Sequence, residues 1–169
     1  MTSGISTATL YPLETEKAVK TLGELGIKNI EIFVNDTSET DGKIRDDVIS
    51  FVRQYDMNVL SVHPFLSPLE TLFLFSDYPR RVNTILDLYR KYFEMARAVG
   101  AHIFVLHGAR KDARCDEATY VERFVLLNRI AAEYGITVAQ ENVHYCKSGS
   151  IDFLKMLKRE CGAKFVLDI

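Results

Sequence analysis

Four side chains of the metal-ligand type stand at equivalent places in successive stretches of this sequence. His63 follows the run VLSV, His107 follows IFVL, Glu141 follows TVAQ and Asp168 follows FVL. Imidazole combined with carboxylate suits zinc, manganese, iron or cobalt better than magnesium or calcium, whose shells are usually all oxygen. One histidine at a strand end is more often structural than a ligand. Four such groups in equivalent places favour a divalent-metal site, with zinc or manganese as the expected ion.

The stretches that carry these side chains repeat one local pattern. An apolar stripe at helical spacing ends, a glycine follows, and a short apolar run leads to the polar residue. A glycine just past a helix can close the last turn in the left-handed conformation, so each one predicts a helix-to-strand junction. The junction residues are Gly26, Gly100, Gly135 and Gly162, with Asp56 in the same role.

Six strands and the helices between them predict an α/β protein with a parallel sheet. The predicted strands cover residues 5–10, 28–34, 57–63, 101–107, 135–141 and 163–168. In parallel α/β folds the ligand site lies at the carboxyl ends of the strands, where the four side chains stand. No glycine-rich dinucleotide or phosphate-binding motif follows any of these strands, so a dinucleotide or P-loop fold is not supported.

Composition limits the class of protein. The 169 residues, 47% hydrophobic and 26% charged, suit one globular domain over residues 1–169. A net charge of −2 and a pI of about 6.1 give no basic field, so nucleic acid is not the expected partner. The sequence contains no membrane-length apolar run and no signal-peptide pattern, and its three scattered cysteines predict reduced thiols in a cytoplasmic protein.

At these strands the sequence also resembles a known family. The segments LSVHPF, IFVLHGAR, ITVAQENVHY and FVLDI resemble strands three to six of the xylose-isomerase-like TIM barrels. That superfamily includes the sugar phosphate isomerases and epimerases and the endonuclease-IV-type apurinic endonucleases. The resemblance implies that Glu141 and Asp168 are metal ligands in both branches. It also implies that His63 and His107 hold an additional metal in the endonuclease branch, although many isomerase-like members carry them too.

The resemblance implies a (β/α)₈ barrel, of which this chain supplies about six βα units. Such a barrel has eight strands and typically about 250 residues. The family's remaining ligands, a histidine on strand seven and a glutamate on strand eight, have no counterpart here. We therefore expect an incomplete barrel that does not turn over substrate alone and whose open strand edges favour association with a second copy.

The leading functional expectation is a metal-dependent sugar or sugar phosphate isomerase or epimerase. By resemblance, the metal would bind neighbouring oxygens of a keto sugar and stabilise an enediolate while Glu141, the expected catalytic residue, moves a proton. A zinc-dependent apurinic endonuclease is the alternative, disfavoured by the near-neutral charge. A non-catalytic remnant is a third reading.

Several neighbouring residues are secondary candidates. Arg110, His144 and Tyr145 follow the fourth and fifth strands and are expected to contact substrate, although Arg110 also suits a solvated basic turn. Glu31, inside the second strand, is expected to bond a neighbouring polar group. The segment after the third strand, with its LFLF run at residues 72–75, is too apolar for a free loop and suits either a lid or an extra helix.

Overall fold

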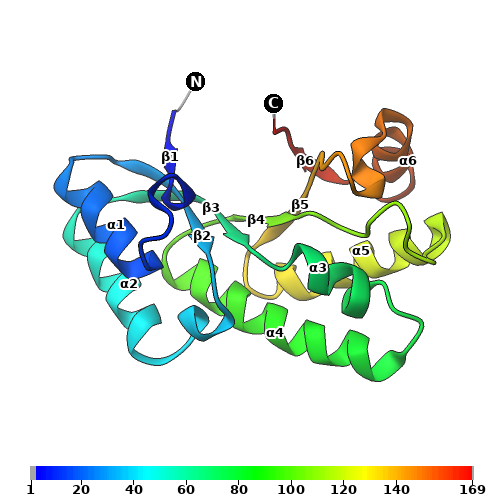
Figure 1. Cartoon of the computed structure of the whole chain (residues 1–169), viewed down its shortest axis with the longest axis horizontal. Helices are drawn as coiled ribbons and strands as arrows, with labels where there is room; N and C mark the ends of the chain where they lie inside the picture. Colours follow the sequence, from blue (N-terminus) through cyan, green and yellow to red (C-terminus); the bar gives the residue numbers. More distant parts are fainter. Residues whose placement is uncertain (1–2, 169) are drawn as a thin grey trace. The chain divides into compact units, whose positions relative to one another are not determined.

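A computed structural model describes residues 3–168 of the chain, and Ile169, the last residue of the FVLDI segment, lies outside that range. Six parallel strands alternate with helices in an α/β fold, and the strand order of the sheet follows the chain from β1 to β6 (Figure 1). The strands are β1 (Ile5–Ser6), β2 (Asn29–Val34), β3 (Asn58–Pro64), β4 (Ile103–Leu106), β5 (Thr137–Glu141) and β6 (Lys164–Val166). The helices are α1 (Thr15–Glu24), α2 (Gly42–Gln54), α3 (Ser67–Leu69), α4 (Pro79–Ala98), α5 (Glu117–Ala132) and α6 (Ile151–Cys161). Shorter helical turns are η1 (Thr7–Leu10), η2 (Thr37–Thr40), η3 (Glu70–Leu74) and η4 (Lys147–Gly149).

The described chain forms two compact units. The first comprises residues up to Phe65 together with Lys91–Phe104, and the second comprises Leu66–Arg90 together with the chain from Val105 onward. Helix α4 and strand β4 each contribute residues to both units. Each unit is considered by itself below.

The first unit is built on the parallel pairing of β1, β2 and β3. Ile5 lies opposite Ile30, and Ile30 opposite Val59. A register shift between Ile30 and Glu31 then places Glu31 opposite Ser61. Helices α1 and α2 pack against each other beside these strands (Figure 1). The core of this unit consists of fully buried aliphatic and aromatic side chains, among them Val19, Ile30, Ile32, Val48, Phe93 and Phe104.

The predicted first strand, residues 5–10, is wrong over its last four residues. Only Ile5 and Ser6 are extended, and Thr7–Leu10 forms a 3₁₀ turn. The Ser6 hydroxyl accepts the Ala8 N–H at 3.3 Å, and the Thr9 hydroxyl donates to the Ser6 carbonyl at 2.8 Å. Such local side-chain bonds compete with a strand ladder, which explains why the strand ends early.

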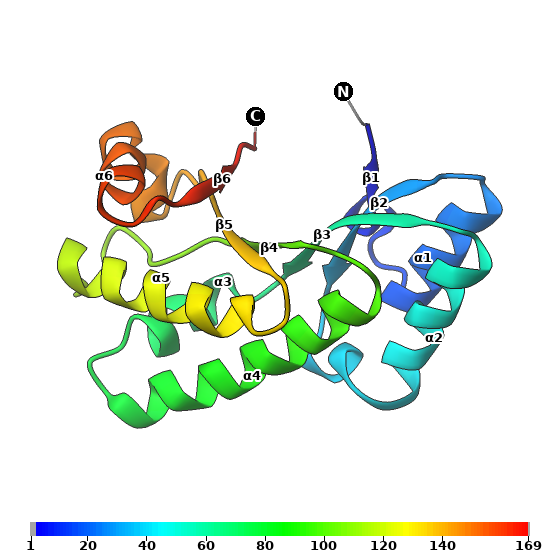
Figure 2. The same ribbon diagram turned by 180° about the vertical axis from the view of Figure 1, so that it is seen from behind.

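The second unit contains the parallel pair β5 and β6 with α5 and α6 (Figure 2). Gln140 lies opposite Phe165, and Glu141 opposite Val166. Tyr120 of α5 is fully buried, stacked on Phe75 with ring centroids 4.3 Å apart and edge-on to Phe153 at 4.8 Å. These rings fasten α5 to α6 and to the segment that follows α3.

The last predicted strand, residues 163–168, is shorter than expected and is largely exposed. Strand β6 ends at Val166; Lys164 is exposed, Phe165 and Val166 are half-buried, and Leu167 is 72% exposed. Beyond the strand, the Asp168 N–H donates to the Asn142 side-chain oxygen at 2.6 Å, and the Asn142 amide donates to the Asp168 carbonyl at 2.8 Å. A side chain, rather than a ladder, therefore holds the end of this segment.

The predicted helix-to-strand junctions are confirmed. Gly26, Gly100, Gly135 and Gly162 have φ values of 76°, 81°, 75° and 67°, and Asp56 has φ 49°. These values lie in the left-handed region, which glycine adopts without the steric cost that other residues meet.

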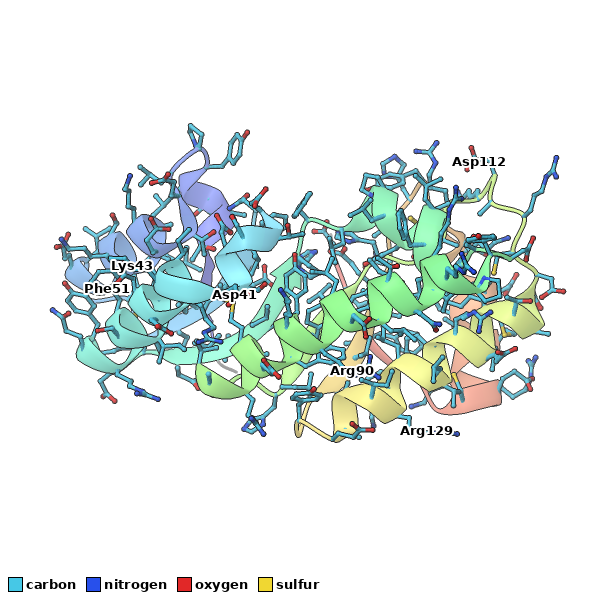
Figure 3. The ribbon with its side chains drawn as sticks, turned by 90° about the horizontal axis from the view of Figure 1, so that it is seen from below. Asp41, Lys43, Phe51, Arg90, Asp112 and Arg129 are labelled. Atoms are coloured by element: carbon cyan, nitrogen blue, oxygen red, sulfur yellow. The ribbon has the colours of Figure 1, made fainter. Side chains whose placement is uncertain are left out.

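Charged side chains lie on the outer surfaces of several helices. Figure 3 shows Asp41 and Lys43 at the start of α2, Arg90 on α4 and Arg129 on α5. Within residues 3–168, no helix combines the length and the apolar character that crossing a membrane requires.

Candidate functional site

Two of the predicted ligands lie together in the second unit. His107 directly follows β4, and Glu141 is the last residue of β5. Their side chains are 12% and 10% exposed, and His107 Nε2 lies 3.4 Å from Glu141 Oε2. Two adjacent strand ends therefore present an imidazole and a carboxylate to the same point.

A third group, Glu70, stands on the other side of the His107 ring. Its carboxylate is fully buried on the π-helical turn η3, and Oε1 lies 3.9 Å from His107 Nδ1. Glu70 Oε2 accepts the Gly108 N–H at 2.6 Å, and Oε1 accepts the Tyr89 hydroxyl at 3.3 Å. Sequence reasoning missed Glu70. The sequence feature that could have indicated it is a single carboxylate inside the apolar stretch PLETLFLF. A carboxylate buried in such a stretch needs polar partners, so it points to a structured site.

The segment after the third predicted strand is helical and forms α3 and η3, as the extra-helix alternative expects, while a role as a lid remains a prediction. Leu66 and Leu74 are fully buried at its two ends, whereas Leu72 is 54% exposed. The helical turn delivers Glu70 to the ends of β4 and β5.

The main chain around His107 is held by Gln140, the glutamine of the segment ITVAQENVHY. Gln140 Nε2 lies 2.9 Å from the carbonyl oxygens of Leu106, His107 and Glu141. Its side-chain oxygen accepts the Tyr120 hydroxyl at 2.6 Å. The amide therefore ties the end of β4 to the end of β5, which fixes the two backbones that carry His107 and Glu141.

The backbone conformation and the close packing at position 108 require a glycine. Its φ is +87°, and a Cβ there would lie 1.9 Å from the Tyr120 hydroxyl oxygen. Burial, and then the charge of Glu70, raises the pKa of Tyr120 well above its ordinary value, so this hydroxyl remains a hydrogen-bond donor at neutral pH.

The loops after β4 and β5 are joined. Arg110 forms an antiparallel bridge with Cys146, and the Lys111 N–H donates to the Tyr145 carbonyl at 3.1 Å. The Arg110 N–H also donates to the Thr71 hydroxyl at 2.9 Å. The predicted substrate contacts Arg110, His144 and Tyr145 all have exposed side chains on these two loops, and the His144 and Tyr145 rings lie edge-on at 5.0 Å.

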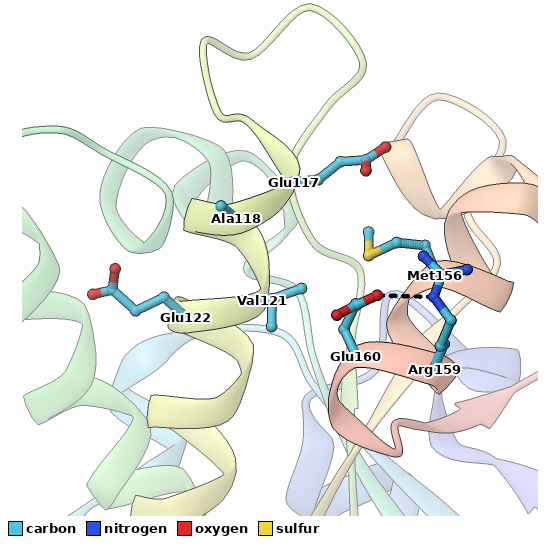
Figure 4. A pocket seen from close by; sticks show the side chains of 7 residues that line it. All are labelled: Glu117, Ala118, Val121, Glu122, Met156, Arg159 and Glu160. Carbon is cyan, nitrogen blue, oxygen red and sulfur yellow. Dashed lines mark hydrogen bonds and ion pairs between the residues drawn. The ribbon is translucent and has the colours of Figure 1, made fainter.

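A cavity of about 450 Å³ lies beside Arg110. Three arginines and two carboxylates contribute to its lining, and Arg110 Nε lies 3.2 Å from Asp112 Oδ1. These charged residues are Arg81, Arg110, Arg114, Asp77 and Asp112. A larger cavity, about 560 Å³, is lined by side chains of α5 and α6, including Val121, Met156 and the Arg159–Glu160 ion pair (Figure 4). It contains none of the strand-end side chains.

Asp168, the fourth predicted ligand, is exposed and lies two residues beyond Val166, the ladder partner of Glu141. Burial raises the pKa of all three cysteines of this unit, Cys161 included, and so favours the thiol over the thiolate. Burial raises the pKa of Cys115 to about 11 and, with the charge of Glu70, that of Cys146 to about 12.

His63 belongs to the first unit, where it precedes the last residue of β3. Its Nδ1 lies 3.6 Å from Glu31 Oε1, and its ring centroid lies 4.9 Å from that of Phe33. Glu31 Oε2 accepts the Ser61 hydroxyl at 2.8 Å, so the expectation that Glu31 bonds a neighbouring polar group is confirmed. Burial alone would raise the pKa of Glu31, but His63 and the hydroxyls of Ser61 and Ser6 outweigh it and hold the pKa below its ordinary value.

Comparison with known proteins identifies the family. The sequence profile of the xylose isomerase-like TIM barrel matches residues 19–169, so the chain belongs to that family, and the predicted family and fold class are confirmed. No curated protein matches the chain significantly.

Solved structures of the same fold include three with informative descriptions. They are 3-keto-D-glucoside 4-epimerase, YcjR, from E. coli (13% identity, TM-score 0.72), D-psicose 3-epimerase in the presence of D-fructose (15%, 0.72), and IOLI protein with a binding zinc atom (14%, 0.70). The matches cover 98%, 99% and 95% of this chain but only 66%, 63% and 59% of those proteins. The chain thus spans less than two thirds of the length of these structures.

Proposed function

We propose that this chain forms part of a divalent-metal-dependent isomerase or epimerase acting on a keto sugar or sugar phosphate. The observation that carries the proposal is the 3.4 Å approach of His107 Nε2 to Glu141 Oε2 at two adjacent strand ends. The family supports it, as do sugar epimerases and a zinc-bound protein of the same fold.

The donors in the second unit fit zinc or manganese. An imidazole nitrogen and a carboxylate oxygen converge there, and both side chains are largely shielded from water. We propose His107 and Glu141 as ligands, joined by His63 and Asp168 from the ends of their own strands. A bound metal would supply positive charge that stabilises the enediolate formed when a proton leaves the carbon beside a carbonyl.

Glu141 is the proposed proton carrier. It would remove a proton from one carbon and return it to the same face of the neighbouring carbon, whereas inversion at one carbon would need a second proton donor on the opposite face, which the extended protein would have to supply. The Gln140 amide donates to the main-chain carbonyl of Glu141 at 2.9 Å and so supports the backbone that carries this carboxylate. Such support matters because proton transfer tolerates little misplacement.

Arg110, His144 and Tyr145 are the proposed substrate contacts. The bridge between Arg110 and Cys146 connects the two loops that carry these three residues. The arginine-lined cavity beside Arg110 suits a phosphate group, because guanidinium groups bind phosphate through paired hydrogen bonds.

Two measurements test the proposal. Isothermal titration of this chain with zinc and with manganese should show binding that Glu141→Gln weakens. A keto sugar incubated in deuterated water, with the chain and with an extended chain that supplies two further βα units, should exchange a carbon-bound proton in the extended protein. Absence of both metal binding and exchange would refute the proposal.

A second candidate is phosphodiester hydrolysis at abasic DNA, which the two strand-end histidines favour. The net charge of −2 disfavours it. Cleavage of an abasic duplex by the extended protein, without proton exchange in sugars, would select this alternative.

A further inference from the structure

The cavity beside Arg110 and the cavity between α5 and α6 differ in what defines an occupant. The one between the helices has nothing beside it that selects a ligand. The one beside Arg110, about 450 Å³ in volume, is lined by two further arginines, Arg81 and Arg114, to which the proposed reaction assigns no role. These side chains and the hydroxyl groups near them define a ligand chemistry.

We infer that the cavity beside Arg110 is a binding site for a phosphate monoester, with Arg81 and Arg114 as its specificity-determining residues. The substrate of the proposed reaction is then the phosphorylated form of a keto sugar rather than the free sugar. This inference rests on the proposed function, which leaves the choice between the two forms open, and it adds a determinant that is separate from the metal ligands.

The three guanidinium groups of the cavity differ in their partners. Arg110 Nε lies 3.2 Å from Asp112 Oδ1. The Arg81 guanidinium carbon lies 5.9 Å from the centroid of the Phe73 ring, which leaves its N–H groups for other acceptors. Within residues 3–168, neither Arg81 nor Arg114 forms an ion pair with a carboxylate. Because guanidinium groups bind phosphate oxygens through paired hydrogen bonds, these two are available to an entering phosphate.

Two hydroxyl groups line the same cavity. The Thr71 hydroxyl accepts the Arg110 N–H at 2.9 Å, and the Ser76 hydroxyl accepts the Tyr78 N–H at 3.1 Å. A hydroxyl that accepts a hydrogen bond still has its own hydrogen to donate. The first of these bonds also ties the cavity wall to the main chain three residues after His107. The cavity therefore combines guanidinium and hydroxyl donors close to the strand end that carries a proposed metal ligand.

The charge balance of the cavity favours an anion. Three arginines against two aspartates leave one positive charge in excess. A phosphate monoester carries a charge of about −1.5 to −2 at neutral pH, whereas a free sugar carries none. The phosphorylated sugar alone gains from this excess, and a cavity of about 450 Å³ is within the size range of small-molecule sites.

The first test measures binding to the metal-free chain. Titration calorimetry at one ionic strength should show that D-fructose 6-phosphate binds at least about tenfold more tightly than D-fructose. Inorganic phosphate should compete with the sugar phosphate, and acetate should not. Equal affinities for the two sugars, or binding of inorganic phosphate without binding of the sugar phosphate, would overturn the inference.

Arginine variants test where the phosphate binds. Arg81→Gln and Arg114→Gln should each weaken binding of D-fructose 6-phosphate about tenfold, which corresponds to the loss of one hydrogen bond to a charged group. Arg129→Gln removes the same charge from an exposed position on α5 that is outside the cavity (Figure 3) and should change the affinity less than about twofold. Equal affinities in all three variants would refute the assignment of the site.

Asp112→Asn should have the opposite effect, which a loss of folding cannot imitate. The substitution removes the carboxylate that competes for Arg110 and raises the positive charge of the cavity, so affinity for D-fructose 6-phosphate should rise about threefold or more. Asp152→Asn, in an exposed ion pair with Lys155 on α6, is the matched control and should leave the affinity unchanged. Weaker or unchanged binding in Asp112→Asn would contradict the inference.

Proton exchange separates this inference from the proposed function. In deuterated water, the extended protein should exchange a carbon-bound proton of keto sugar phosphates with a kcat/KM at least about tenfold higher than that for the free sugars. Equal exchange in both forms would overturn the inference and leave the proposed function standing. Absence of exchange in either form, with phosphate binding that still depends on Arg81 and Arg114, would refute the proposed function and leave the phosphate site standing.

Discussion

The two units of this molecule contain the same chemical pair built in two ways. In the first unit, Glu31 reaches His63 from the neighbouring strand, and the sheet register that sets Glu31 opposite Ser61 brings them together. In the second, Glu70 comes from a helical turn 37 positions before His107 and is fully buried. The first pair depends on a strand ladder, whereas the second depends on several buried hydrogen bonds. Substitutions in the second unit should therefore have larger and less local effects.

The largest effect is expected for Glu141→Gln. Glutamine keeps the shape of the side chain but removes its charge and basicity, so turnover in the extended protein should fall on the order of 10²–10⁴-fold. Zinc affinity should fall with it, while circular dichroism of the variant should match that of the unaltered protein. Glu160→Gln, in an exposed ion pair on α6, is the control and should leave both turnover and zinc affinity unchanged. An active Glu141→Gln variant would remove Glu141 from the mechanism.

Gly108→Ala should cost more stability than Gly26→Ala. The new Cβ would meet the Tyr120 hydroxyl at 1.9 Å, and φ is unfavourable as well. We expect a loss of about 3 kcal/mol or more in the free energy of unfolding, measured with urea. Gly26→Ala in the first unit, with a similar φ of +76° but no heavy atom within 4 Å of the added Cβ, isolates the backbone strain at about 1 kcal/mol. Equal losses of unfolding free energy in the two variants would show that the contact with Tyr120 adds nothing to the cost of the backbone strain.

Tyr120→Phe should have an intermediate effect. It removes the donor to Gln140 and leaves a buried amide oxygen without that bond, which should lower the free energy of unfolding by about 1–2 kcal/mol. Because Gln140 holds the His107 carbonyl, zinc affinity should fall a few-fold as well. Tyr78→Phe, at a residue 54% exposed, is the matched control. A loss of stability without any change in zinc affinity would show that Tyr120 stabilises the packing of α5 but does not influence the proposed metal site.

The smallest effect is expected in the first unit, from Glu31→Gln. The pKa of Glu31 is held below its ordinary value, so ionised Glu31 stabilises the fold above the unfolded-state pKa, and this contribution disappears as pH falls through the lower folded-state value. The variant should be less stable than the unaltered chain by about 1 kcal/mol or less at pH 6, and the difference should shrink below about pH 4.5. Urea unfolding at several pH values measures it, with Glu24→Gln as the exposed control. A difference that grows in acid would contradict the assigned direction.

Sequence patterns predicted the elements that depend on local chemistry. Glycines after apolar stripes predicted the helix ends, and the position of Glu31 within its strand predicted that it bonds a polar neighbour, although not which one. Glu70 could not be placed in this way, because its role depends on a helical turn meeting the end of a strand 37 positions further along the chain. The early end of β1 and the exposure of β6 depend similarly on individual hydroxyl and amide contacts that periodicity does not encode. Convergence of all four strand-end side chains at one metal remains a prediction.

The pairing of β5 with β6 has one more consequence. Gln140 and Glu141 are consecutive, so their side chains leave opposite faces of the strand, the amide toward Tyr120 and the carboxylate toward His107. If β5 shifted by one position along β6, the side chains of Gln140 and Glu141 would exchange faces. The charge of Glu141 would then enter the aromatic packing under α5, and the uncharged Gln140 amide would take the ligand position. A one-position shift of this register would thus leave neither Tyr120 nor the proposed metal with its partner.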